Sequence, residues 1–162
     1  MKVRTITYGL SLNDTDFQED GRLQEKLSVA ASRLEQIRTK VTDNGYEVQT
    51  SRICFNRLED WLILSTFTEQ LTYLSSIIDK YPIFNIVSLG CCDTVSYINM
   101  CTDFLLVSPK FNCSVNLPMS PEDGIYTLPD HQKCLAAANV CVKLSKWDIT
   151  GGANFRYVLV MV

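Results

Sequence analysis

Segments with the pattern of a strand alternate with segments with the pattern of a helix, and this order restricts the fold more than any other feature of the chain. Residues 2–10 alternate between two sets of side chains, as the residues of a strand do. The two sets are Val3, Thr5 and Thr7, and Arg4, Ile6 and Tyr8. Similar patterns predict strands at 46–54, 83–89, 111–117 and 154–162, and helices at 22–43, 68–80, 93–107 and 130–146. The order predicts one α/β domain over residues 1–162, with a largely parallel sheet.

The helix predicted at 22–43 has the clearest pattern. Its apolar residues recur every three or four positions and form one stripe. They are Leu23, Leu27, Ala30, Leu34, Ile37 and Val41. We expect Leu27, Leu34 and Ile37 to pack against the sheet, and Asn44-Gly45 to end the helix. Residues 83–89 are apolar on both faces, so we expect helices to cover both sides of the sheet.

Charge and composition exclude several classes of function. The net charge is −3 and the pI is about 5.1, so no basic excess exists to bind the phosphates of nucleic acid. No apolar run approaches the roughly 20 residues of a membrane helix, and residues 1–12 lack the apolar core of a secretory signal. We therefore expect a cytoplasmic protein with no membrane or nucleic-acid partner.

The seven cysteines show no C-x-x-C spacing, and the chain has one histidine, His131. A transition-metal site is therefore not expected, and Gly151-Gly152 lacks the spacing of a phosphate-binding loop. In a reducing compartment we expect seven free thiols and no intrachain disulfide. We expect Asp130 to cap the helix that follows it, with His131 exposed in its first turn.

Ligands of parallel α/β folds meet the loops at the carboxyl ends of the strands. Thr7 lies near such an end, and the last predicted strand carries Asn154. Arg4, Arg52 and Arg156 lie within predicted strands, where a covered guanidinium needs a carboxylate or a ligand. These residues are candidates for binding an anionic small molecule. Structural ion pairs, or edge positions in water, explain the arginines equally.

The segment Gly90-Cys91-Cys92-Asp93 follows a predicted strand and precedes a predicted helix. A thiolate at a helix N-terminus has a lowered pKa and is a nucleophile, which makes Cys91, Cys92 and Asp93 candidate catalytic residues. The alternative is that Asp93 simply caps the helix. Asn56 is expected to cap a short turn in the same way.

The strand at the end of the chain, residues 157–162, is apolar on both faces. Such a strand is stable inside a sheet or against another chain. We expect it to be inserted between earlier strands or to be covered by a second copy or partner chain. The chain is expected to be a truncated or partial version of a longer fold.

Four segments carry a family resemblance: MKVRTITYGL at 1–10, NGYEVQTSRI at 44–53, IVSLG at 86–90 and GANFRYVLVMV at 152–162. Together they resemble the N-terminal part of domain-of-unknown-function family 711, also called uncharacterised protein family 0210. The resemblance implies a fold similar to the first part of the ten-stranded α/β barrel of pyruvate formate-lyase.

On that resemblance the chain is expected to be an enzyme-like barrel protein that binds a small anionic metabolite. The alternative is a non-catalytic relative or subunit that acts through self-association or a partner chain. Neither the residues nor the resemblance identifies a reaction or a cofactor. The sequence departs from the family pattern at Cys91 and Cys92, where members have small residues, and at 99–116.

Overall fold

A five-stranded parallel sheet forms the centre of the computed structural model, which describes residues 1–117, 121–122, 125–126, 130–147, 153 and 156–161. Its strands are β1 (Lys2–Leu10), β2 (Glu47–Phe55), β3 (Ile86–Cys92), β4 (Phe111–Leu117) and β7 (Tyr157–Met161). The helices are α1 (Arg22–Asp43), α2 (Phe67–Ile78), α3 (Val95–Val107) and α4 (His131–Trp147). The short elements are the 3-10 helices η1 (Asp14–Phe17) and η2 (Leu58–Asp60), and the antiparallel pair β5 (Pro121–Glu122) and β6 (Ile125–Tyr126). The predicted α/β fold with a parallel sheet is confirmed.

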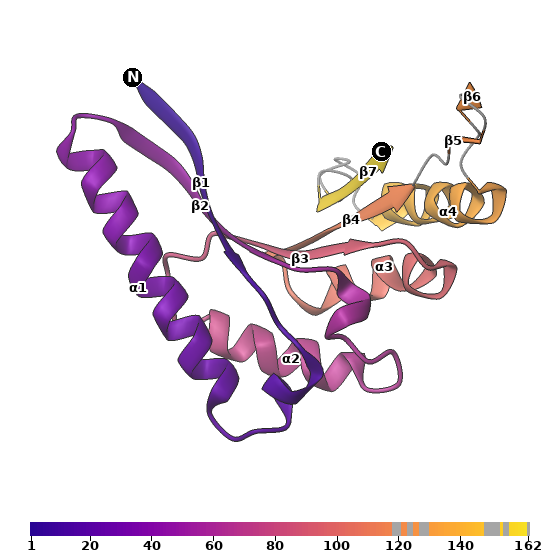
Figure 1. The fold of residues 1–162 in the computed structure, drawn as a ribbon, viewed down its shortest axis with the longest axis horizontal. Coiled ribbons are helices and arrows are strands. Elements are labelled where there is room, and N and C mark those ends of the chain that lie inside the picture. Colours follow the sequence, from indigo (N-terminus) through magenta and orange to yellow (C-terminus); the bar gives the residue numbers. More distant parts are fainter. Residues whose placement is uncertain (118–120, 123–124, 127–129, 148–152, 154–155, 162) are drawn as a thin grey trace.

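The strands lie in the order β1-β2-β3-β4-β7, so each strand of this sheet pairs with the one before it in the chain. Right-handed crossovers that always step in one direction place their helices on one face of the sheet. Consecutive helices accordingly contact one another, α1 with α2, α2 with α3 and α3 with α4 (Figure 1). For the elements that the structure describes, the expectation that helices cover both faces was wrong, because that arrangement requires the strand order to reverse partway.

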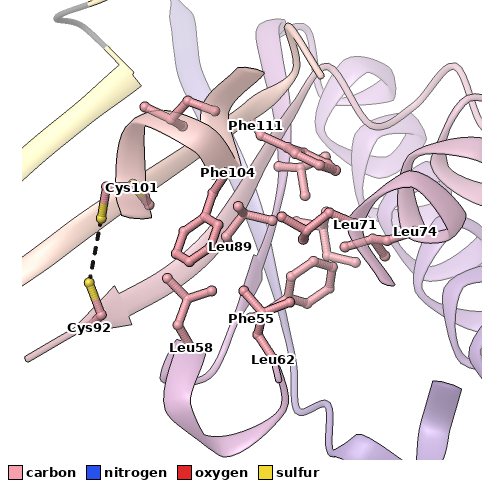
Figure 2. Close-up of a cluster of buried hydrophobic side chains, with 14 of the residues drawn as sticks. Phe55, Leu58, Leu62, Leu71, Leu74, Leu89, Cys92, Cys101, Phe104 and Phe111 are labelled. Atoms are coloured by element: carbon pink, nitrogen blue, oxygen red, sulfur yellow. Dashed lines mark hydrogen bonds between the residues drawn. The ribbon is translucent and has the colours of Figure 1, made fainter. Parts of the chain in front are cut away.

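The core lies between this helix layer and the sheet face beneath it. Ile53, Val87, Phe111 and their alternate neighbours on the same strands are buried there, against the apolar sides of the helices. Figure 2 shows side chains from the strands, η2, α2 and α3 meeting in one cluster. Its labelled apolar members are Phe55, Leu58, Leu62, Leu71, Leu74, Leu89, Phe104 and Phe111.

The stripe of α1 is fully buried only as far as Leu34. Leu27 and Leu34 are fully buried, as expected, but Ile37 is 41% exposed. Figure 1 shows the end of α1 beside the projecting starts of β1 and β2, away from α2 and α3. A residue on an amphipathic stripe is buried only where another element lies opposite it, and Ile37 lies beyond that region.

The third strand differs from its prediction at both ends. β3 begins at Ile86 and continues through Gly90 to Cys92, with a shift of register against β4 between Ser88 and Cys91. Gly90 has φ +104°, which suits glycine, so it forms an irregularity within the strand instead of ending it. The shift carries Cys91 and Cys92 into the sheet.

The last strand lies at an edge. β7 pairs with β4, and the order of the sheet places no strand on its other side. The expected insertion between earlier strands was therefore wrong for the described residues Tyr157–Met161. Val158, Leu159 and Val160 are 52%, 44% and 37% exposed.

Candidate functional site

One face of the sheet carries no helix among the described elements, and we call it the uncovered face. Alternation along the strands and their register place every second residue on it. Its residues are Val3, Thr5, Thr7, Gly9, Val48, Thr50, Arg52, Cys54, Ile86, Ser88, Cys91, Asn112, Ser114, Asn116, Val158 and Val160. Its small polar residues, which have few counterparts on the helix-covered face, are Thr5, Thr7, Thr50, Ser88, Asn112, Ser114 and Asn116.

The register brings two predicted residues together. Thr7 of β1 lies directly opposite Arg52 of β2, and one step further along Gly9 lies opposite Cys54. Cys54 in turn pairs with Ser88 of β3, and Ser88 with Asn112 of β4. Arg52 therefore lies beside a row of small side chains that crosses four strands. We call Thr7, Gly9, Arg52, Cys54, Ser88 and Asn112 the Arg52 site.

Arg52 is the one charged residue of the uncovered face in the part of the chain that the structure describes. Its guanidinium forms no ion pair there, and its Nε atom is shielded from water without a hydrogen-bond partner. Buried polar groups are normally paired, so an arginine in this state is a candidate for a missing ligand. The shielded atom is Nε, so the two terminal nitrogens are those that a ligand can reach.

The other predicted arginines lie elsewhere. Arg4 shares its side of β1 with Ile6 and Tyr8, so it lies on the helix-covered face, where it is exposed. Arg156 precedes β7 at the opposite end of the sheet. Its guanidinium donates to the backbone carbonyls of Phe111, Leu105 and Ser108, and burial lowers its pKa. Asn154 lies outside the described residues.

The thiols at the end of β3 have the wrong electrostatics for a nucleophile. Cys92 is fully buried, and its Sγ lies 3.6 Å from Sγ of Cys101 on α3. That hydrogen bond, followed by burial, raises the pKa of Cys92, while burial raises the pKa of Cys91. The expected lowering of a thiol pKa by the helix N-terminus was wrong. None of the seven cysteines forms a disulfide in the described part of the chain.

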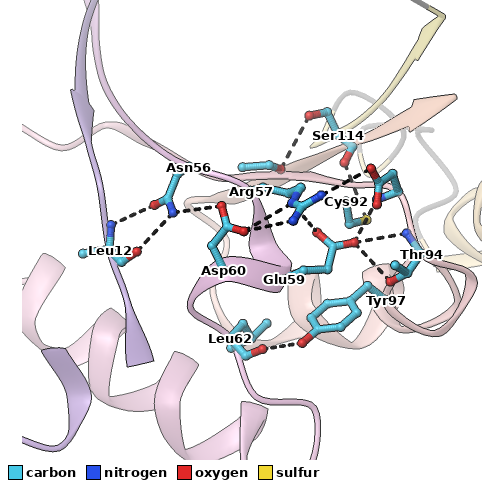
Figure 3. Close-up of polar contacts among 12 residues, drawn as sticks. Leu12, Asn56, Arg57, Glu59, Asp60, Leu62, Cys92, Thr94, Tyr97 and Ser114 are labelled. Atoms are coloured by element: carbon cyan, nitrogen blue, oxygen red, sulfur yellow. Dashed lines mark hydrogen bonds and ion pairs between the residues drawn. The ribbon is translucent and has the colours of Figure 1, made fainter. Parts of the chain in front are cut away.

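A carboxylate from a distant part of the chain occupies the N-terminus of α3. Oε1 of Glu59, in η2, accepts from the backbone N–H groups of Asp93 and Thr94, at 2.9 and 3.1 Å, and from the Thr94 hydroxyl (Figure 3). The side chain of Asp93 instead approaches Arg57 at 3.6 Å. Asp93 is therefore not the cap that the sequence predicted. Glu59 replaces it, and it also fills the position where an anion would meet the dipole of this helix.

Arg57 links the carboxylates at this edge of the sheet. Its guanidinium lies 3.2 Å from Asp60 and 3.9 Å from Glu59, in addition to Asp93. Interaction with Asp60 raises the pKa of Arg57 most strongly. One guanidinium thus faces three carboxylates, in contrast to Arg52, which faces none among the described residues.

Asn56 joins the ends of β1 and β2. Its amide oxygen accepts from Leu12 N at 2.8 Å, and its amide nitrogen donates to Leu12 O at 3.1 Å (Figure 3). The sequence suggested that Asn56 caps the following turn, and this prediction was wrong.

Asp130 caps α4, as predicted, by accepting from Gln132 N and Lys133 N, and His131 is exposed.

A hollow of about 410 Å³ lies on the other side of the molecule, between η1 and α2. It is lined in part by Phe17, Gln70 and Tyr73. The amide of Gln70 already bonds to Ile63 N and Trp61 O. The polar group of this hollow is thus already hydrogen-bonded, whereas Arg52 has no partner in the described ranges, so the hollow is the weaker candidate for a ligand site.

Comparison with known proteins gives one match. No curated protein matches the chain, and no solved structure does, so the predicted similarity to the pyruvate formate-lyase barrel stays a prediction. None of the described helices combines the length and the apolar character that crossing a membrane requires. No group of three or more His, Cys, Asp or Glu residues in the described ranges is arranged to hold a metal ion. The family model described as "Uncharacterised ACR (DUF711)" matches residues 1–161, so the chain belongs to this family, as its four segments indicated.

Proposed function

We propose that the chain belongs to an enzyme-like α/β protein and binds a small anionic molecule on the uncovered face of its sheet. The observation that carries this proposal is Arg52, a guanidinium without a partner on a face of small polar side chains. The guanidinium of Arg52 is half-buried and has no counter-charge in the part of the chain that the structure describes, and an anion bound to its two terminal nitrogens would supply one.

The electrostatics at the end of β3 favour binding at Arg52 over chemistry by a thiolate. Cys92 points into the core and its thiol is neutral, while Glu59 already fills the N-terminus of α3. The role proposed for the Arg52 site is therefore recognition and orientation of a ligand. No reaction is assigned to it.

The cytoplasm is the proposed location. Cys92, Cys101 and Cys113 lie buried in the core as thiols and form no disulfide. Free thiols persist in reducing compartments.

Replacing Arg52 with Gln tests the proposal, because the change removes the charge and keeps a polar side chain. Amide resonances of the ¹⁵N-labelled chain are followed during addition of acetate, sulfate and phosphate. We expect at least one anion to shift the resonances of Thr7, Gly9 and Ser88 saturably in the unmodified chain and not in Arg52→Gln. Arg4→Gln, which removes an exposed arginine from the other face, should bind as the unmodified chain does. Equal binding by Arg52→Gln contradicts the proposal.

A second candidate function, self-association, rests on β7. Its outer edge has no partner strand, and Val158, Leu159 and Val160 are exposed beside it. Unpaired backbone groups and apolar side chains at a sheet edge are a template for another strand. A second copy of the chain is the proposed occupant, because two copies present identical apolar edges that can cover each other.

A further inference from the structure

The charge of the uncovered face is a single positive one. Apart from Arg52, its residues are small polar or apolar side chains that carry no charge at neutral pH. A ligand with one negative charge is neutralised at such a site. A ligand with two negative charges keeps one uncompensated charge against the sheet, which is unfavourable where water is partly excluded.

The features that proteins use to bind phosphate are absent from the described part of this site. Phosphates favour a free helix N-terminus, or several cations. The N-terminus of α3, the helix that follows β3, is occupied by the carboxylate of Glu59. Arg57 beyond it is surrounded by Glu59, Asp60 and Asp93. A planar guanidinium acting alone is instead matched in shape and charge by one carboxylate.

The neighbours of Arg52 are suited to a second, neutral group on the ligand. Adjacent strands lie about 4.8 Å apart and alternate residues about 6.6 Å apart along a strand. Ser88 lies one strand and two residues from Arg52, since Arg52 pairs with Ile86. Gly9 leaves open space in the same row, because nothing lies within 4 Å of the position of a Cβ atom there. A molecule of a few heavy atoms held at Arg52 therefore extends past Cys54 toward Ser88, and Gly9 leaves open space on the other side of Cys54.

We infer that the ligand of the Arg52 site is a small monocarboxylate that carries a neutral hydrogen-bonding group, such as a hydroxyl, next to the carboxylate. The inference rests on the proposed function and specifies its ligand class. The carboxylate binds the terminal nitrogens of Arg52, and the neutral group bonds to the hydroxyl of Ser88, with Asn112 as the next polar side chain in the row.

Three probes test the inference on the full chain: glycolate, acetate and inorganic phosphate. Dissociation constants are measured by titration of the amide resonances of Thr7, Gly9, Arg52 and Ser88. We expect glycolate to bind more tightly than acetate, by about two- to tenfold for one added hydrogen bond, and phosphate to bind most weakly. Arg52→Lys, which keeps the charge but loses the planar fork, should weaken both carboxylates. Ser88→Ala should remove the difference between glycolate and acetate and leave acetate unchanged. Arg4→Gln is the control on the opposite face.

The outcomes separate the inference from the proposed function. If phosphate binds at these residues as tightly as glycolate, the ligand class is wrong and anion binding at Arg52 stands. If acetate equals glycolate in the unmodified chain, the neutral group is not recognised and that part of the inference fails. If none of the three probes shifts these resonances saturably, both the inference and the proposed function are wrong.

Discussion

The carbonyl oxygen of Asn56 lies 1.9 Å from the position that a Cβ atom on Gly90 would take. The loop after β2 thus packs directly against the backbone of β3. Gly90 also has a positive φ, which side-chain-bearing residues rarely adopt. Gly90 lies where β3 changes register against β4, so both features help to position the end of β3.

Replacing Gly90 with Ala should therefore destabilise the fold strongly. The methyl group cannot fit without moving backbone, and the conformation is strained as well, so we expect a loss of about 3 kcal/mol or more in the free energy of unfolding. Urea denaturation followed by circular dichroism measures it. Gly9→Ala is the matched control, since its Cβ meets open space, and it should change stability by less than about 1 kcal/mol. Similar losses in the two variants would show that the close approach is not important.

Replacing Glu59 with Ala should weaken the start of α3. The change removes one carboxylate oxygen that accepts two backbone N–H groups and a hydroxyl, so we expect a loss of about 1–2 kcal/mol. Faster amide exchange at Asp93 and Thr94 should accompany it. Glu47→Ala removes an exposed carboxylate whose partner is Lys2, and it should have little effect. Unchanged exchange at Asp93 and Thr94 would contradict the assigned cap.

The buried thiols predict a loss of stability at alkaline pH. Hydrogen bonding to Cys101 and burial raise the pKa of Cys92 above its ordinary value of 9.0, so the folded state holds this proton more tightly than the unfolded state. The contribution is fully present below pH 9.0 and decreases as the pH rises past it, because only the unfolded chain then releases the proton.

Melting temperatures between pH 7 and 10.5 test this prediction. The melting temperature should fall above about pH 9, and the fall should be shallower in Cys92→Ala than in the unmodified chain. Val87→Ala is the control, since it removes volume from the same core and no titrating group. Identical slopes in Cys92→Ala and Val87→Ala would mean that other groups cause the alkaline transition.

The exposed edge of β7 predicts an assembly that one substitution disrupts. Val160→Asp places a charge on a strand that we propose is covered by a second copy, so the unmodified chain should sediment as a dimer and the variant as a monomer. Val160 is 37% exposed in the single chain. The melting temperature of the monomeric variant should therefore remain close to that of the unmodified chain diluted until it is monomeric. Val29→Asp, on the exposed side of α1, should leave the dimer intact. A monomeric unmodified chain at tens of micromolar would rule out the self-association.

Local patterns in the sequence predicted the elements well, because periodicity reports burial directly. The two sides of β1 and the full extent of β4 were correct, as was the burial of Leu27 and Leu34. Ile37 was wrong because the same stripe continues past the end of the core. Periodicity cannot show where the element opposite a helix stops.

The sequence of β4 contains a pattern that indicates the uncovered face, and the prediction of helices on both faces did not use it. β4 alternates strictly between buried residues and the half-buried Asn112, Ser114 and Asn116, which indicates a sheet covered on one side. The cap of α3 had no comparable signal. Glu59 lies 35 residues before Thr94, and only the three-dimensional fold brings the two together.

Because each strand of the main sheet pairs with the strand that precedes it within that sheet, the sheet can assemble in the order in which the ribosome releases it. β1 and β2 can pair once α1 is complete, and β3 and β4 then add to the growing edge. The connection from β4 to β7 contains β5, β6 and α4, so this last pair closes only after these elements have been made. A nascent chain held before Tyr157 would already contain four paired strands, with the outer edge of β4 open to the strand still being synthesised.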